Sequence, residues 1–212
     1  MATPTSSVHI CNLALDRLGQ REIASIDDPT TENENICSRH YDQTRRKALR
    51  KYIFNFSKKY VSLTKSATKT PAFGYSSAYA LPNDFVRLLA LGDTTVMDDV
   101  PAGLYDLSEG YIFTDAAGGG TLFLTYVYDA KTVSVYDPLF IDVFTLELAA
   151  AMAYKFTLKQ SLVNALKSDL LDAQMAASAV AGQEKPPRRI QTSYLITARR
   201  MGLGRRDNSR YP

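Results

Sequence analysis

The chain has 212 residues, 25 basic and 22 acidic side chains, and a hydrophobic content of 45%. This composition is typical of a globular protein with a sizeable core, built as one large domain or as a domain with an insertion. No apolar run approaches the ~20 residues that span a bilayer. The first seven residues lack the charged start and apolar segment of a signal peptide, so we expect no export by that route.

The charge is unevenly distributed along the sequence. Residues 186–212 hold seven arginines and a single acid, whereas residues 1–185 hold 18 basic and 21 acidic side chains. The C-terminal segment therefore carries +6 and the rest of the chain −3. A basic segment of this kind is typical of an arm that meets an acidic partner.

The first third of the chain predicts two helices. Ser6 or Ser7 can cap a helix that runs to Leu18, with Gly19 as its stop. A longer helix is predicted from about Thr30–Thr31 to about Tyr52. Its C-terminal end is crowded with cations, namely Arg45, Arg46, Lys47, Arg50 and Lys51. We interpret these as a solvated face that suits the helix dipole, with a nucleic-acid patch as the alternative.

Residues 57–132 have β character and turn signals, which predicts a small antiparallel region inserted between helical halves. Aromatic residues at even spacing favour a strand over 73–79, and an apolar run favours another over 86–91. Residues 104–113 are typical of a hairpin, and the alternation over 121–128 predicts the clearest strand.

Two further helices are predicted between Tyr136 and Gly182, the first beginning at Asp137-Pro138 and the second ending before Pro186-Pro187. We expect an α+β fold in which two N-terminal helices (residues 1–56) and two C-terminal helices (133–185) pack as a four-helix unit. The basic arm, 186–212, follows. Four residues are predicted to serve helix packing or a subunit interface: Phe140, Phe144, Ala150 and Ala151.

The sequence has few residues suited to catalysis or metal binding. We expect Cys11 and Cys37 to be small buried hydrophobes, because no export signal favours a disulfide. Cys37 and His40 could pair a thiol with a base, but such a pair is more often structural. The one polar cluster to nominate for an enzyme is Tyr75, Asp84 and Arg87, which turn geometry explains equally well. We therefore expect no catalytic, cofactor-binding or metal residues.

The arm combines apolar anchors with arginines, which favours docking on a protein over binding phosphates, because a phosphate-binding tail needs no such anchors. The alternatives are a nucleic-acid arm and a solvated tail. The predicted docking residues are Arg188, Arg189, Ile190, Tyr194, Leu195, Ile196, Arg199 and Arg200.

Several of these patterns resemble the head-to-tail adaptors of short-tailed bacteriophages, the tail tubular protein A family. The similarity lies in residues 10–19, in the long helix over 35–49, in Tyr79–Arg87 with its Leu81-Pro82, and in the Ala- and Leu-rich helix over 138–153. These motifs are structural, so the resemblance transfers no catalytic residue.

The resemblance implies a structural ring, expected to be a dodecamer, beneath the portal of the virion at the head-tail junction. Its implied partners are further copies of itself, the portal protein and the tail tube or nozzle protein; whether tail fibres attach stays open. Genomic DNA would pass through the channel without sequence-specific binding, and no membrane is involved. The alternative function is a nucleic-acid-binding protein that uses the Arg-rich tail and the basic end of the second helix.

Overall fold

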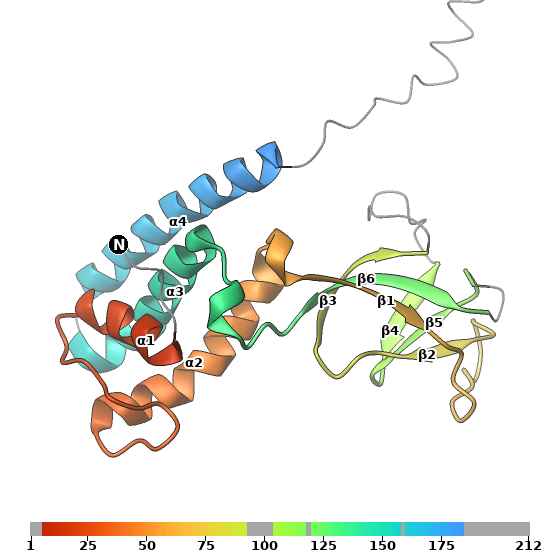
Figure 1. Ribbon diagram of the computed structural model, residues 1–212, viewed down its shortest axis with the longest axis horizontal. Coiled ribbons are helices and arrows are strands. Elements are labelled where there is room, and N and C mark those ends of the chain that lie inside the picture. The colour runs from red at the N-terminus through yellow and green to blue at the C-terminus, as the bar shows by residue number, and fades with distance from the viewer. Residues whose placement is uncertain (1–5, 93–103, 118–119, 158–159, 185–212) are drawn as a thin grey trace, which may run out of the picture. The chain divides into compact units, whose positions relative to one another are not determined.

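A computed structural model describes residues 6–92, 104–117, 120–157 and 160–184 of the chain. Within these ranges the fold is α+β, with four α-helices and two small three-stranded antiparallel sheets (Figure 1). The chain divides into two units, Met1–Ala181 and Gly182–Pro212. The elements described below belong to the first unit, apart from the last residues of the fourth helix.

Two capped helices open the chain, as the sequence predicts. α1 (Ser7–Asp16) begins at Ser6, whose hydroxyl accepts a hydrogen bond from the His9 N–H. It ends two residues before the predicted Leu18, and Gly19 follows with a φ of 64°. α2 (Glu32–Lys51) begins with a capping box in which Thr31 and Glu34 satisfy each other's backbone N–H groups.

The connection between these helices is held by side chains. The Asn12 amide donates to the Ile23 carbonyl and accepts from the Ile23 N–H. The Glu34 carboxylate accepts from the N–H groups of Thr31, Thr30 and Ala24. The hydrogen bonds from Thr31 and Thr30 are the main reason that the pKa of Glu34 falls to about 2.

The C-terminal helices are α3 (Pro138–Thr157) and α4 (Gln160–Gln183). The Asp137 carboxylate accepts from the Leu139 N–H, so the predicted Asp-Pro start is confirmed. α3 contacts both α1 and α2 and is apolar on nearly all sides, which fits its position inside the helical core. By contrast α4 buries Val163, Leu166 and Ala177, one side of the helix alone.

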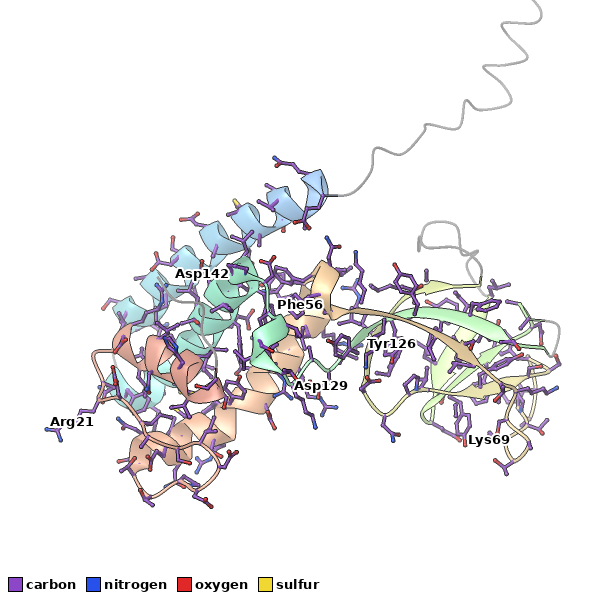
Figure 2. All side chains as sticks on the ribbon, in the orientation of Figure 1. Arg21, Phe56, Lys69, Tyr126, Asp129 and Asp142 are labelled. Atoms are coloured by element: carbon purple, nitrogen blue, oxygen red, sulfur yellow. The ribbon has the colours of Figure 1, made fainter. Side chains whose placement is uncertain are left out.

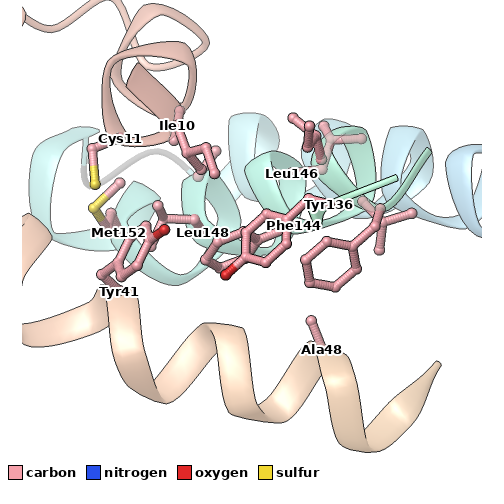
Figure 3. Packing of buried hydrophobic residues seen from close by; sticks show 14 of the residues in the cluster. Ile10, Cys11, Tyr41, Ala48, Tyr136, Phe144, Leu146, Leu148 and Met152 are labelled. Carbon is pink, nitrogen blue, oxygen red and sulfur yellow. The ribbon is translucent and has the colours of Figure 1, made fainter. Parts of the chain in front are cut away.

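The helical core is centred on aromatic and aliphatic side chains of α3 (Figure 3). Phe140 lies between Phe54, Phe56 and Tyr136, with ring centroids 5.0 to 5.2 Å apart. The ring centroids of Phe144 and of Tyr41 in α2 lie 5.2 Å apart in an edge-to-face arrangement. Fully buried side chains of α1, α2 and α3 thus form one continuous core, in which each aromatic pair adds to the hydrophobic burial.

Two sheets make the β region. The first has the order β1 (Lys58–Leu63), β6 (Leu122–Tyr128), β3 (Phe85–Leu91); the second has the order β2 (Ala78–Ala80), β5 (Tyr111–Thr114), β4 (Tyr105–Ser108). The predicted hairpin is confirmed as β4–β5, because both turn residues, Glu109 and Gly110, have positive φ (54° and 77°) as a two-residue hairpin turn requires.

The two sheets share a second core, separate from that of the helices. Its buried members are Tyr79, Leu88, Leu91, Ile112, Leu122, Leu124 and Tyr126. The predicted strands over 86–91 and 121–128 correspond to β3 and β6. The predicted strand over 73–79 is wrong over most of its length: the strand there is Ala78–Ala80, and Phe73 is 89% exposed in the preceding loop. Even aromatic spacing failed there because Gly74 has a positive φ of 84°, which interrupts an extended backbone.

Candidate interaction surfaces

The basic end of α2 faces a buried carboxylate that follows β6. Arg45 Nε lies 3.1 Å from Asp129 Oδ1, and Arg45 also pairs with Asp42 on its own helix. Arg46 adds a contact of 3.4 Å to Asp129 Oδ2. Figure 2 shows Asp129 where the helices meet the strands. The prediction of a solvated basic face is therefore wrong for Arg45, because its side chain is almost wholly buried.

A second buried acid, Glu147 of α3, receives the remaining lysines of α2. Lys47 Nζ lies 3.0 Å from Glu147 Oε2, Lys51 Nζ lies 3.6 Å from Oε1, and the Tyr52 hydroxyl donates to Oε1 at 3.3 Å. The Lys47 contact is an ion pair without hydrogen-bond geometry. Within the described part of the chain, Glu147 Oε2 therefore accepts no hydrogen bond. Because both lysines are half or more exposed, their attraction to the acid is partly screened by water.

Two arginines link the helices to the sheet by hydrogen bonds to main-chain carbonyl groups. Arg50 of α2 donates to the Val86 carbonyl at 2.8 Å, and Arg87 of β3 donates to the Arg50 carbonyl at 3.2 Å. We call the contacts of Arg45, Arg46, Arg50, Arg87 and Asp129 the helix–sheet junction, whereas Lys47, Lys51 and Glu147 join α2 to α3. Each cation of the predicted basic cluster has a partner in the chain itself, which reduces what the cluster can offer to a phosphate backbone.

The sequence analysis missed the two buried acids, Asp129 and Glu147. Asp129 follows a strand, where an isolated acid suggests a turn, and Glu147 is the one acid between Val143 and Ala153 in an apolar helix. The second case carried a usable signal, because a lone charge on a buried helix needs an opposite charge nearby. The cations of α2 that pair with these acids lie about 100 residues away in sequence. The sequence therefore does not indicate which cation meets which acid.

The predicted interface residues of α3 separate into two groups. Phe140 and Phe144 are fully buried in the helical core of the chain itself. Ala150 is half-buried and Ala151 is exposed. The predicted docking residues of the arm, Arg188 to Arg200, lie outside the described residues.

Of the residues nominated for chemistry, Cys37, Asp84 and Arg87 have structural contacts within the chain. Cys11 and Cys37 are free and fully buried, and the Cys37 thiol lies 3.8 Å from the Met152 sulfur. Asp84 accepts hydrogen bonds from Lys59 and Tyr126, whereas Arg87 binds the Arg50 carbonyl. Burial opposes ionisation of Asp84, but these two hydrogen bonds outweigh it and lower its pKa. Among the described residues no group of three or more His, Cys, Asp or Glu could hold a metal ion.

Two surfaces on the described part of the chain expose pairs of large apolar side chains. The sheet surface, on the face of β1–β6–β3 opposite the shared core, consists of Tyr60 and Phe123. The helix surface, on the outer side of α4, consists of Lys167, Leu171, Asp172 and Met175.

No protein-family model and no characterised protein matches the chain. Within the described ranges, no helix is both long enough and apolar enough to cross a bilayer.

Proposed function

We propose that the protein is a structural assembly subunit: a head-to-tail adaptor that forms a ring below the portal of a short-tailed phage and joins it to the tail. The observation that carries the proposal is the pair of exposed apolar surfaces, on a chain in which the nominated residues Asp84 and Arg87 are engaged in structural contacts. Exposed apolar surface of this kind is typical of a contact with another protein.

In this proposal the four helices act as one unit and the β region is an insertion within it. The support is that α1, α2 and α3 share one core to which α4 adds Val163 and Leu166. The helix–sheet junction would keep the insertion at a fixed angle to the helices, which a ring subunit needs for every copy to present the same contacts.

The basic segment 186–212 is proposed to be the docking arm. Its apolar anchors, Ile190, Tyr194, Leu195 and Ile196, would enter pockets of the portal, and its arginines would pair with carboxylates around them. An arm that becomes ordered on binding lets the portal trigger assembly, because the cost of ordering the chain is met only in the complex.

The test is the molar mass in solution, measured by light scattering, with and without purified portal protein. A large ring, alone or on addition of portal, is the expected result. A chain that stays monomeric in both conditions contradicts the adaptor proposal. Affinity for DNA that falls steeply with salt would then favour the nucleic-acid alternative, which depends on the same arginines of the arm.

A further inference from the structure

Three sulfur atoms from three different helices gather inside the helical core. Cys11 lies on α1, Cys37 on α2 and Met152 on α3, and all three side chains are fully buried. The Cys37 thiol donates to the Met152 sulfur at 3.8 Å. The thiols of Cys11 and Cys37 also interact, and Figure 3 shows the Cys11 sulfur turned toward that of Met152. We call these three residues the sulfur cluster.

The spacing within the sulfur cluster suits a bound metal ion. An ion that lies in one plane with three sulfurs, about 2.3 Å from each, holds these sulfurs about 4 Å apart. The separation of 3.8 Å between Cys37 and Met152 is close to that value. Because ordinary contacts between sulfur atoms have a similar length, the kind of donor and the surroundings decide which ion the cluster takes.

The donors of the sulfur cluster are all soft. Thiolate and thioether sulfurs select Cu(I), whereas Mg²⁺ and Ca²⁺ take oxygen ligands. Structural zinc sites have four ligands drawn from Cys, His and carboxylates. Within the described ranges, no group of three or more such side chains is placed to hold an ion. A thioether beside two thiols therefore favours Cu(I) over Zn²⁺.

Tyr41 of α2 adds a second feature that favours a cation. Its hydroxyl is buried and, by distance and angle, has no hydrogen-bond partner in the described part of the chain. The same side chain interacts electrostatically with Cys11, and Figure 3 shows its ring beside Met152. A cation in the sulfur cluster would thus lie close to an aromatic ring and an unpaired oxygen, both of which attract positive charge.

We propose that the sulfur cluster binds one Cu(I) ion through Cys11, Cys37 and Met152. The ion would replace the S–H proton of one thiol, and this proton would leave to water. Cu(I) and a single thiolate together carry no net charge, so the pair can be buried in an apolar core. Since each ligand comes from a different helix, the ion would join α1, α2 and α3. This site goes beyond the adaptor function and does not depend on it.

The burial of all three sulfurs predicts how the ion enters. None of the three side chains reaches the solvent, so the core must open before an ion can bind. Cu(I) should therefore bind quickly while the chain folds and slowly once it is folded. A metal site on the surface would load at the same rate in both conditions.

The test begins with the full chain unfolded in urea. It is refolded without oxygen beside one equivalent of Cu(I), kept reduced by ascorbate, and then challenged with the Cu(I) chelator bicinchoninate. Wild type should retain one ion per chain. Native chain given Cu(I) without unfolding should load more slowly, by about 10-fold or more, because the core must open. X-ray absorption of the loaded chain should show sulfur ligands alone, at about 2.3 Å.

Variants assign the ion to the sulfur cluster. Cys11→Ala and Cys37→Ala should each weaken binding by about 100-fold or more, because a thiolate is the stronger donor. Met152→Leu should weaken it by about 10-fold and keeps the volume of the core, so it decides the test even where an alanine variant does not fold. The matched control is Met175→Leu, which removes a methionine that is 69% exposed and should bind as wild type. Circular dichroism verifies folding.

Stability gives an independent readout. An ion that binds the folded chain raises the urea midpoint, so Cu(I) should raise it in wild type and in Met175→Leu, and raise it less in Met152→Leu. A wild-type chain that retains no copper after refolding overturns the proposal. So does equal retention by the cysteine variants and Met152→Leu, or nitrogen and oxygen ligands in the absorption spectrum. The sulfur cluster would then be core packing alone, and the adaptor function, which the molar mass tests, would be unaffected.

Discussion

Arg45 and Asp129 form an ion pair in which both side chains are almost wholly buried, with Arg45 Nη2 3.0 Å from Asp129 Oδ1. They are separated by 84 residues and join the end of α2 to the segment that leaves β6. Because a buried charge without its partner is very unfavourable, this pair links the position of the β region to that of the helices.

Replacement of Arg45 by Met should lower the free energy of unfolding by about 3–5 kcal/mol, because Asp129 would remain buried without its main partner. Urea denaturation followed by circular dichroism measures the change. The double variant Arg45→Met with Asp129→Leu should be less destabilised than the sum of the two single variants, because it removes both charges. Arg46→Met is the control, since Arg46 is more than half exposed and should cost under about 1 kcal/mol. A loss below 1 kcal/mol for Arg45→Met would contradict the assigned role.

The capping carboxylate Glu34 predicts a pH dependence of stability. Its pKa in the folded chain is about 2, lowered from an ordinary value of 4.5 chiefly by the backbone N–H groups of Thr31 and Thr30. The folded state therefore binds this proton more weakly than the unfolded state does. The stabilisation is complete above pH 4.5 and is lost as the pH falls toward 2.

The comparison to make is between wild type and Glu34→Gln, by urea denaturation over a series of pH values. The difference in free energy of unfolding should be constant near neutral pH and shrink as the pH falls from 4.5 toward 2. Asp28→Asn, an exposed residue of the same connection, is the control and should show little such change. A difference between wild type and Glu34→Gln that is independent of pH would mean that the carboxylate charge contributes nothing.

The helices and most strands could be predicted because their signals are local. Ser6, Thr31 and Asp137 each mark a helix start within three residues, and alternation over 121–128 marks a buried strand. The junction could not be predicted, because Arg45 and Asp129 meet only after the whole β region has folded between them. Nor could the sheet surface: Tyr60 and Phe123 become neighbours only through the register of β1 on β6.

The two thiols should be inert in the folded chain. Cys11 and Cys37 are fully buried, which keeps a reagent in solution away from both sulfur atoms. Reaction with a thiol reagent such as Ellman's then requires opening of the core, so it should be slower than in urea by on the order of 1,000-fold or more. A Phe73→Cys variant provides an exposed thiol as the control. Rapid modification of two thiols in native wild type would show that the core opens easily.

Deletion of residues 186–212 separates the arm from the folded body. The arm belongs to the second of the two units of the chain, Gly182–Pro212, so the truncated chain should keep its helical content and its urea midpoint while it loses docking to the portal. Calorimetry with purified portal protein measures the loss.

In the full chain, replacement of Tyr194, Leu195 and Ile196 by Ala should cost more than about 2 kcal/mol of docking free energy, because buried anchors dominate interfaces. Replacement of Arg205 and Arg206 by Gln should cost under about 1 kcal/mol each, since rim charges contribute less. If the truncated chain unfolds, the arm is part of the core. If the arginine changes cost more docking than the alanine changes, the arm binds an acidic partner such as DNA.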